Sequence, residues 1–255
     1  MANRPVLEIC VESVDYAVAA ERGGAQRIEL CTDLPSGGVT PSAALMQTAR
    51  RQLRIPIHVL IRPRAGDFYY SDDELERMRK DIRAAKQFGM DGVVVGILRE
   101  SGHVDIERTE ALVELAHPLP VTFHRAFDAS PDLDRSLEDV IQTGASRILT
   151  SAGRPRAADA LSTMARLVQA ARDRIVIMAC GGINADNVVH IVRTTLAQEI
   201  HSSAGTSNPG FPVNGSDLTE GNSEADSSLS SALFEKKVSK LVSLLETVSC
   251  DERVR

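Results

Sequence analysis

The chain alternates between short apolar runs and longer segments in which apolar residues recur every three or four positions. The short runs are rich in β-branched residues, which is typical of buried parallel strands, and the longer segments have the period of amphipathic helices. We expect strands over residues 6–11, 27–31, 56–62, 92–97, 120–125, 146–151, 175–180 and 199–203. A helical or linking segment follows each of them, so the pattern predicts a series of βα units.

Capping signals mark several helix starts. Ser71 and Glu74 have the spacing of a capping box, in which each side chain accepts a hydrogen bond from the backbone of the other. Thr40 and Ser130 each precede a proline, and a hydroxyl cap followed by proline is typical of a first helical turn. We therefore expect helices to begin at all three places.

Eight such units in 255 residues match the size of a TIM (β/α)8 barrel. Apolar residues make up 43% of the chain and charged residues 25%, which is enough for one large core. The sequence therefore predicts an α/β protein with a single barrel domain over residues 1–255. An open, doubly wound sheet is the alternative fold.

The last unit has a different composition. Residues 205–231 are rich in Gly, Ser, Asn and Asp and nearly free of apolar side chains, so we expect a disordered loop there. Apolar residues then return with helical spacing at Leu233, Val238, Leu241, Val242, Leu244 and Leu245. They predict a C-terminal helix that closes the barrel.

The composition of the chain narrows the classes of partner that can be expected. A formal charge of −6 and a pI near 5.6 argue against binding to nucleic acid. No segment has the pattern of a secretion signal or a membrane span, so we expect a cytoplasmic protein with no membrane partner, or a nuclear one if the source is eukaryotic. The four cysteines are then expected to be reduced thiols.

Polar residues within the apolar strands indicate what faces the barrel interior, because side chains alternate between the interior and the helices. In "VLEICVE" this alternation turns Glu8 and Cys10 inward, and in "RIELC" it turns Glu29 and Cys31 inward. The same reasoning directs His58, Arg62, Arg64, His124 and His201 toward the interior. Asp67 follows in the next loop, where it can pair with an arginine.

These groups lie toward the carboxyl ends of their strands, where barrel enzymes carry their active sites. As an enzyme, the protein would use Glu8, Glu29 or His124 for acid-base chemistry on a small anionic or phosphorylated substrate. The candidate anion-binding residues are Arg62, Arg64, Asp67 and His201. Alternatively, the charges only neutralise one another inside the barrel.

Glycines and hydroxyls in "ACGGI" and "HSSAG" follow the seventh and eighth expected strands. Many barrels bind phosphate at this place, but a glycine pair also occurs in an ordinary turn. Both interpretations remain open.

Cys10 and Cys31 form a second candidate site. Adjacent strands lie about 4.8 Å apart, so two inward thiols could share a metal ion. Two thiolates without further ligands favour Cu(I). The alternative is that both cysteines only fill the core as small apolar residues.

Several segments, taken together and in order, resemble the copper homeostasis protein CutC family: "RIELC", "GGVTPS", "IRPRAGDFYYSDDE", "VTFHRAFD", "RILTS" and "EIHSSA". The resemblance covers roughly residues 6–204. It implies a cytosolic TIM barrel, a homo-oligomer such as a dimer or tetramer, and a role in copper trafficking or tolerance. It also implies that Cys10 and Cys31 bind copper as Cu(I).

Overall fold

The computed structural model describes residues 4–205 and 224–248, with side chains from residue 230 onward in the second range. The strands are β1 Val6–Val11, β2 Arg27–Leu30, β3 Ile57–Leu60, β4 Gly92–Val95, β5 Val121–Phe123, β6 Arg147–Thr150, β7 Val176–Ala179 and β8 Glu199–Ser202. The α-helices are α1 Val14–Arg22, α2 Ala43–Gln52, α3 Asp72–Gln87, α4 Ile106–Ala116, α5 Leu133–Gln142, α6 Leu161–Ala171, α7 Val188–Thr195 and α8 Glu224–Leu245. Short 3-10 helices lie at η1 Leu34–Ser36, η2 Arg125–Ala129 and η3 Ala157–Asp159.

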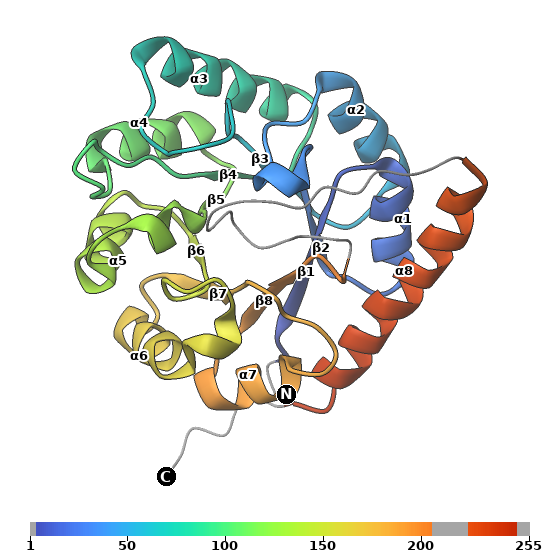
Figure 1. The fold of residues 1–255 in the computed structure, drawn as a ribbon. Coiled ribbons are helices and arrows are strands. Elements are labelled where there is room, and N and C mark those ends of the chain that lie inside the picture. Colours follow the sequence, from blue (N-terminus) through green and yellow to red (C-terminus); the bar gives the residue numbers. More distant parts are fainter. Residues whose placement is uncertain (1–3, 206–223, 249–255) are drawn as a thin grey trace.

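The strands form a closed parallel barrel in sequence order, with β8 pairing back onto β1. Figure 1 shows the helices as a ring around these strands. The predicted TIM barrel is confirmed, and every expected strand is found within three residues of its expected ends. The open-sheet alternative is excluded, because each strand pairs with two neighbours.

The capping box at the start of α3 is confirmed, but the other two predicted helix starts are wrong. Helix α2 is capped by Ser42 and helix α5 by Asp132, each two residues later than expected. Thr40 instead uses its hydroxyl to tie down the end of β3, where it exchanges hydrogen bonds of 2.9 and 3.1 Å with the backbone of Arg62. Helices α2 and α5 therefore begin later than expected because Ser42 and Asp132 cap them. For α2, the contact of Thr40 with Arg62 also makes the Thr40 hydroxyl unavailable as a cap.

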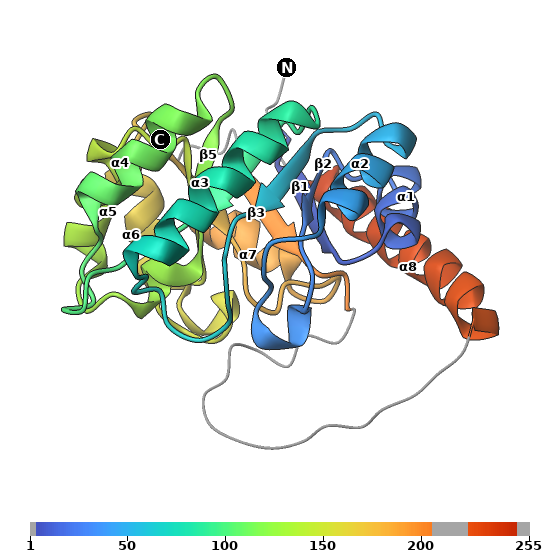
Figure 2. The same cartoon turned by 90° about the horizontal axis from the view of Figure 1, so that it is seen from above.

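Helix α8 closes the ring next to α1, as expected of the last apolar segment (Figure 2). Phe234, Val238 and Leu241 are buried in the main core, and the Phe234 ring packs edge-on against Tyr16 at 4.9 Å between ring centres. The helix begins at Glu224, within the segment expected to be a loop, while residues 206–223 lie outside the described residues. Among the described helices, none is both long enough and apolar enough to cross a membrane.

The alternation predicted for the strands holds at the mouth of the barrel. Ile28 and Leu30 belong to the main core shared with the helices. Cys10 and Cys31 belong to a separate apolar cluster inside the barrel, completed by Leu34, Leu60 and Val94. The two thiols are thus surrounded by apolar side chains that are separate from the main core.

Candidate functional site

Cys10 and Cys31 bring their sulfur atoms together at the C-terminal mouth of the barrel. Their Sγ atoms lie 3.6 Å apart, and both residues are buried. One ion can bridge two thiolates only if the sulfurs are closer than about 5 Å, because metal–sulfur bonds are near 2.3 Å. The two thiols therefore meet the geometric requirement for a shared ion.

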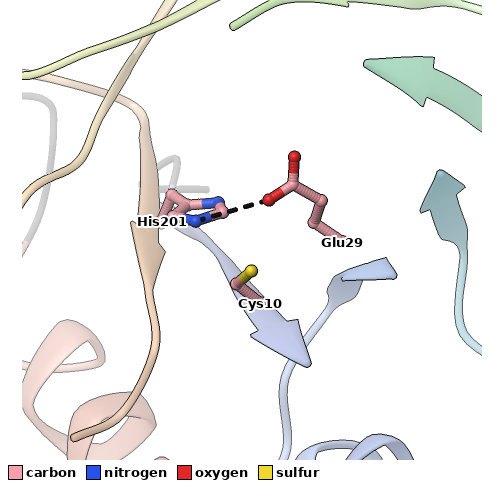
Figure 3. A group of neighbouring side chains, drawn as sticks. All are labelled: Cys10, Glu29 and His201. Atoms are coloured by element: carbon pink, nitrogen blue, oxygen red, sulfur yellow. Dashed lines mark ion pairs between the residues drawn. The ribbon is translucent and has the colours of Figure 1, made fainter. Parts of the chain in front are cut away.

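His201 of β8 and Glu29 of β2 lie beside Cys10 (Figure 3). The His201 Nε2 atom is 3.6 Å from a carboxylate oxygen of Glu29. The other ring nitrogen, Nδ1, makes a 2.7 Å hydrogen bond with Glu8 of β1. Three neighbouring strands thus place a thiol, an imidazole and a carboxylate around one point, while Glu8 contacts the far side of the imidazole ring.

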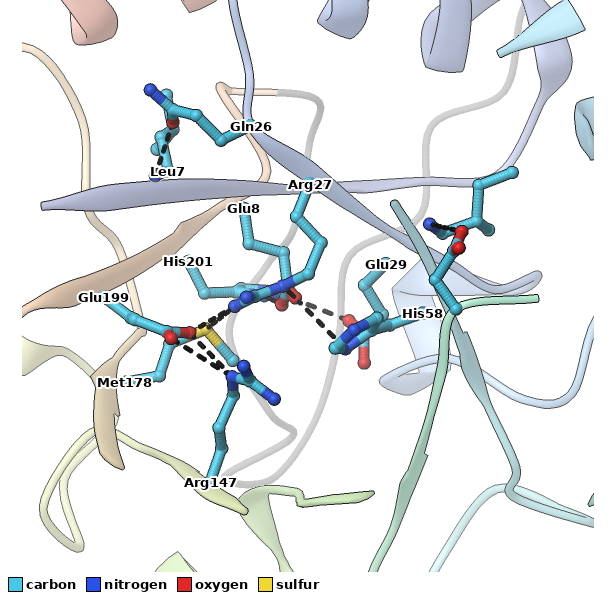
Figure 4. A network of polar contacts seen from close by, with 12 residues as sticks. Leu7, Glu8, Gln26, Arg27, Glu29, His58, Arg147, Met178, Glu199 and His201 are labelled. Carbon is cyan, nitrogen blue, oxygen red and sulfur yellow. Dashed lines mark hydrogen bonds and ion pairs between the residues drawn. The ribbon is translucent and has the colours of Figure 1, made fainter. Parts of the chain in front are cut away.

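A network of buried charges adjoins this group through the contact of His201 with Glu8 (Figure 4). Arg27 donates hydrogen bonds to Glu8 and to Glu199, and Arg147 reaches Glu199 at 2.9 Å. Arg27, Arg147 and Glu199 are not among the predicted site residues. All three lie within expected strands, and alternation from Glu29 turns Arg27 inward. Alternation does not show which charges on other strands these side chains reach.

The network sets the charge of the carboxylates. Burial alone would raise the pKa of Glu8, but Arg27 and the hydrogen bond from His201 outweigh it and hold that pKa far below its usual range. Burial raises the pKa of Glu29, despite the opposing charge of His201. Burial acts to lower the pKa of His201, yet its hydrogen bond to Glu8 and the charge of Glu29 raise it.

The thiols are held in the protonated form. The hydrogen bond to Cys31, followed by burial, raises the pKa of Cys10 well above its usual value. For Cys31 the hydrogen bond from Cys10 acts to lower the pKa, but burial and Glu29 raise it. Without a metal ion, these thiols are therefore poor nucleophiles at neutral pH.

A cavity of about 70 Å³ opens beside the cluster and is lined by Cys10, Glu29, Cys31, Arg62, His124 and His201, among others. Six of the nine residues predicted for the site thus border one small space. His124 accepts a hydrogen bond from the Ala126 backbone at its Nδ1 atom. Burial, followed by the charge of Arg62, lowers the pKa of His124 to about 3, so its ring is neutral at physiological pH.

Three predicted residues lie elsewhere. Glu8 is fully buried in the charge network and does not line this cavity. Arg64 and Asp67 pair with each other at 2.9 Å, and Arg64 also contacts Glu74 at 2.6 Å on the partly exposed rim. The expected convergence of Arg64 on the interior is therefore wrong, whereas the expected pairing of Asp67 with an arginine is confirmed.

Glu29 makes its ion pair with His201 of β8, while its register partner on β3 is His58. The guanidinium of Arg62 donates to the backbone oxygens of Ser36, Gly38 and Gly66. Arg62 thus secures two loops over the mouth of the barrel.

The glycine pair after β7 borders a second cavity of about 310 Å³, which Arg125 and Cys10 also line. A Cβ atom at Gly181 would come 2.9 Å from the carbonyl oxygen of Pro155. Close packing of the neighbouring loop therefore accounts for this glycine. That contact favours the turn interpretation over a dedicated phosphate site.

Fold and site together define a TIM-barrel protein with a cluster of thiol, imidazole and carboxylate groups at its C-terminal mouth. The CutC family model matches residues 5–206, and the chain belongs to the CutC family.

Two named relatives and one solved structure are similar over most of the chain. The copper homeostasis protein cutC homolog of Homo sapiens is 48% identical over 80% of this chain and 74% of its own length. The homolog of Mus musculus is 46% identical over 89% of this chain and 84% of its own. A crystal structure of CutC from Streptococcus agalactiae superposes with a TM-score of 0.75 at 33% identity, covering 78% of this chain and 98% of that one.

Proposed function

We propose that this protein binds one Cu(I) ion through Cys10 and Cys31 and contributes to intracellular copper trafficking or tolerance. The observation that carries the proposal is the 3.6 Å separation of the two sulfur atoms inside the barrel. Thiolates are soft ligands and favour Cu(I) over hard cations. The names of the human and mouse relatives support the same metal.

The surroundings of the thiols suit a cuprous ion. Leu34, Leu60 and Val94 pack around the pair and limit the access of water. Because both thiols are held in the protonated form, binding of Cu(I) has to release protons. Affinity is therefore expected to rise with pH.

Titration of the reduced, metal-free protein with Cu(I) under anaerobic conditions tests the proposal, with a coloured chelator as competitor. We expect one Cu(I) per chain. Cys10→Ser and Cys31→Ser should each weaken binding at least tenfold, since each removes one of two ligands. Cys180→Ser is the matched control, because Cys180 is also a buried thiol but belongs to a different apolar cluster.

A Cys10→Ser/Cys31→Ser variant that binds Cu(I) as tightly as the parent protein would refute the proposal. The trafficking role has a separate test, which is the growth of cells lacking the gene in copper-supplemented medium. The cytoplasmic location and the homo-oligomer remain predictions. So does the alternative of an enzyme, for which only Arg62 and His201 of the expected anion-binding residues line the central cavity.

A further inference from the structure

Cys10 belongs to a second set of potential ligands that does not include Cys31. One ligand atom each from Cys10, Glu29 and His201 lies within 4.8 Å of the other two. The three residues come from β1, β2 and β8, which are adjacent in the closed barrel. Figure 3 shows their side chains directed toward a common point.

The donor atoms of this second set differ in kind from those of the thiol pair. Sulfur, imidazole nitrogen and carboxylate oxygen together suit a borderline divalent ion such as Zn²⁺, whereas Cu(I) prefers sulfur alone. Three protein ligands with a fourth position open is the usual arrangement of a non-structural zinc site. The cavity of about 70 Å³ beside these residues leaves room for a fourth, exogenous ligand.

The distance between the His201 nitrogen and the Glu29 oxygen also fits a shared zinc ion. Two zinc bonds of about 2.0–2.1 Å at a tetrahedral angle hold their nitrogen and oxygen atoms about 3.3 Å apart. The His201 Nε2 atom and the Glu29 oxygen are 3.6 Å apart. An adjustment of a few tenths of an ångström would therefore bring both atoms onto one ion.

The outer contacts of His201 are those of a metal-binding histidine. Such histidines almost always bind a carboxylate or carbonyl through the second ring nitrogen, which fixes the orientation of the ring. His201 makes this contact with Glu8 at 2.7 Å, and Arg27 in turn fixes Glu8. The Nε2 atom is thereby left facing Cys10 and Glu29.

We propose that Cys10, Glu29 and His201 form a binding site for Zn²⁺ that shares Cys10 with the copper site. Because one thiolate cannot serve both ions in full, zinc and cuprous ions compete for the protein. The competition rests on the proposed function, whereas the zinc site itself does not.

Metal titrations of the reduced, metal-free full-length chain test the proposal, with Zn²⁺ and Cu(I) measured separately against competing chelators. We expect one Zn²⁺ per chain. His201→Gln and Glu29→Gln should each weaken zinc binding at least tenfold and leave Cu(I) binding within about twofold. Cys31→Ser should weaken Cu(I) binding at least tenfold and leave zinc binding within about twofold. Cys10→Ser should weaken the binding of both ions.

His190→Gln is the matched control, because His190 is exposed on α7 and lies outside the cluster. X-ray absorption of the zinc-loaded parent protein adds a readout that does not depend on any variant. It should report one sulfur and one imidazole bound to zinc. The absence of stoichiometric zinc, a coordination shell with two sulfurs, or a folded His201→Gln variant with unchanged zinc affinity would each overturn the proposal.

A chain that binds zinc as expected but takes up no Cu(I) would refute the copper function and leave the zinc site standing. A chain that binds Cu(I) but no zinc would refute the zinc site and leave the copper function standing. The two proposals therefore fail separately.

Discussion

Two individual side chains, His58 and His124, are buried imidazoles that lose their charge in the fold. Burial lowers the pKa of His58 to about 4, although Glu8 opposes the shift, and it lowers the pKa of His124 to about 3. In the unfolded chain both rings titrate near 6.5. Below that pH the unfolded chain binds more protons than the folded one, so acid favours unfolding.

Stability should therefore fall as the pH drops from 6.5 toward 5, by about 1 kcal/mol per pH unit for each of the two histidines. His201 does not contribute in this range, because its raised pKa acts only above 6.5. The raised pKa of Glu29 acts above 4.5 and opposes the fall, so the comparison of the parent protein with His124→Asn isolates the histidine contribution. Urea unfolding at several pH values measures the slope. His124→Asn should reduce it by about 1 kcal/mol per pH unit, while His190→Asn on the exposed face of α7 should not; an unchanged slope in His124→Asn would contradict this.

Several of the site residues could be predicted from the sequence alone. Alternation along a strand correctly turned Cys10, Glu29 and Cys31 inward, because the two-residue period is fixed by the backbone. It failed for Arg64, since β3 ends at Leu60 and the period has no meaning in the loop that follows. Which partner a long charged side chain reaches depends on strands far apart in the sequence, so the pairing of Glu29 with His201 was not predictable.

Among the strands, β4 and the residue that follows it leave room for two neighbouring imidazoles. A Cβ atom at Gly92 would lie 2.5 Å from the ring of His58, and one at Gly96 would lie 2.4 Å from the ring of His124. Such contacts are far inside van der Waals distance. The sequence shows that this apolar run is bounded by glycines. It does not show that the glycines leave space for the imidazole rings of His58 on β3 and His124 after β5.

Gly96→Ala should consequently destabilise the protein by about 1–3 kcal/mol, because the added methyl group forces His124 out of place. Removing the ring as well, in Gly96→Ala/His124→Ala, should cost less than the sum of the single changes. Gly92→Ala combined with His124→Ala is the matched control and should be additive, since Gly92 contacts His58 instead. Additivity in both pairs, measured by urea unfolding, would rule out the steric explanation.

In the closed barrel, one charge network joins strands from both sides. Glu8 of β1, Arg27 of β2, Arg147 of β6 and Glu199 of β8 neutralise one another in the interior. The eightfold βα pattern was sufficient to predict a closed barrel. It did not indicate that opposite strands are linked by charge, because that link depends on the closed shape itself.

Arg27→Met should destabilise the protein by about 3–5 kcal/mol, since it leaves Glu8 buried without its cation. Arg27→Met/Glu8→Gln should recover part of that loss, because the second change removes the unpaired charge. Denaturant midpoints measure both effects. Arg166→Met, at an exposed pair with Asp134, should have no measurable effect. A similar loss in both arginine variants would argue against the network.

The register of β1 and β2 has a consequence for oxidation. Cys10 lies opposite Glu29, so Cys31 is two residues further along its strand. From the spacing and rise of paired strands, their Cα atoms are about 8 Å apart, whereas a disulfide requires less than about 7 Å. The two sulfurs touch, yet the backbone resists a covalent bond between them. Oxidants that couple other close cysteines should therefore leave this pair as two thiols, ready to bind metal without prior reduction.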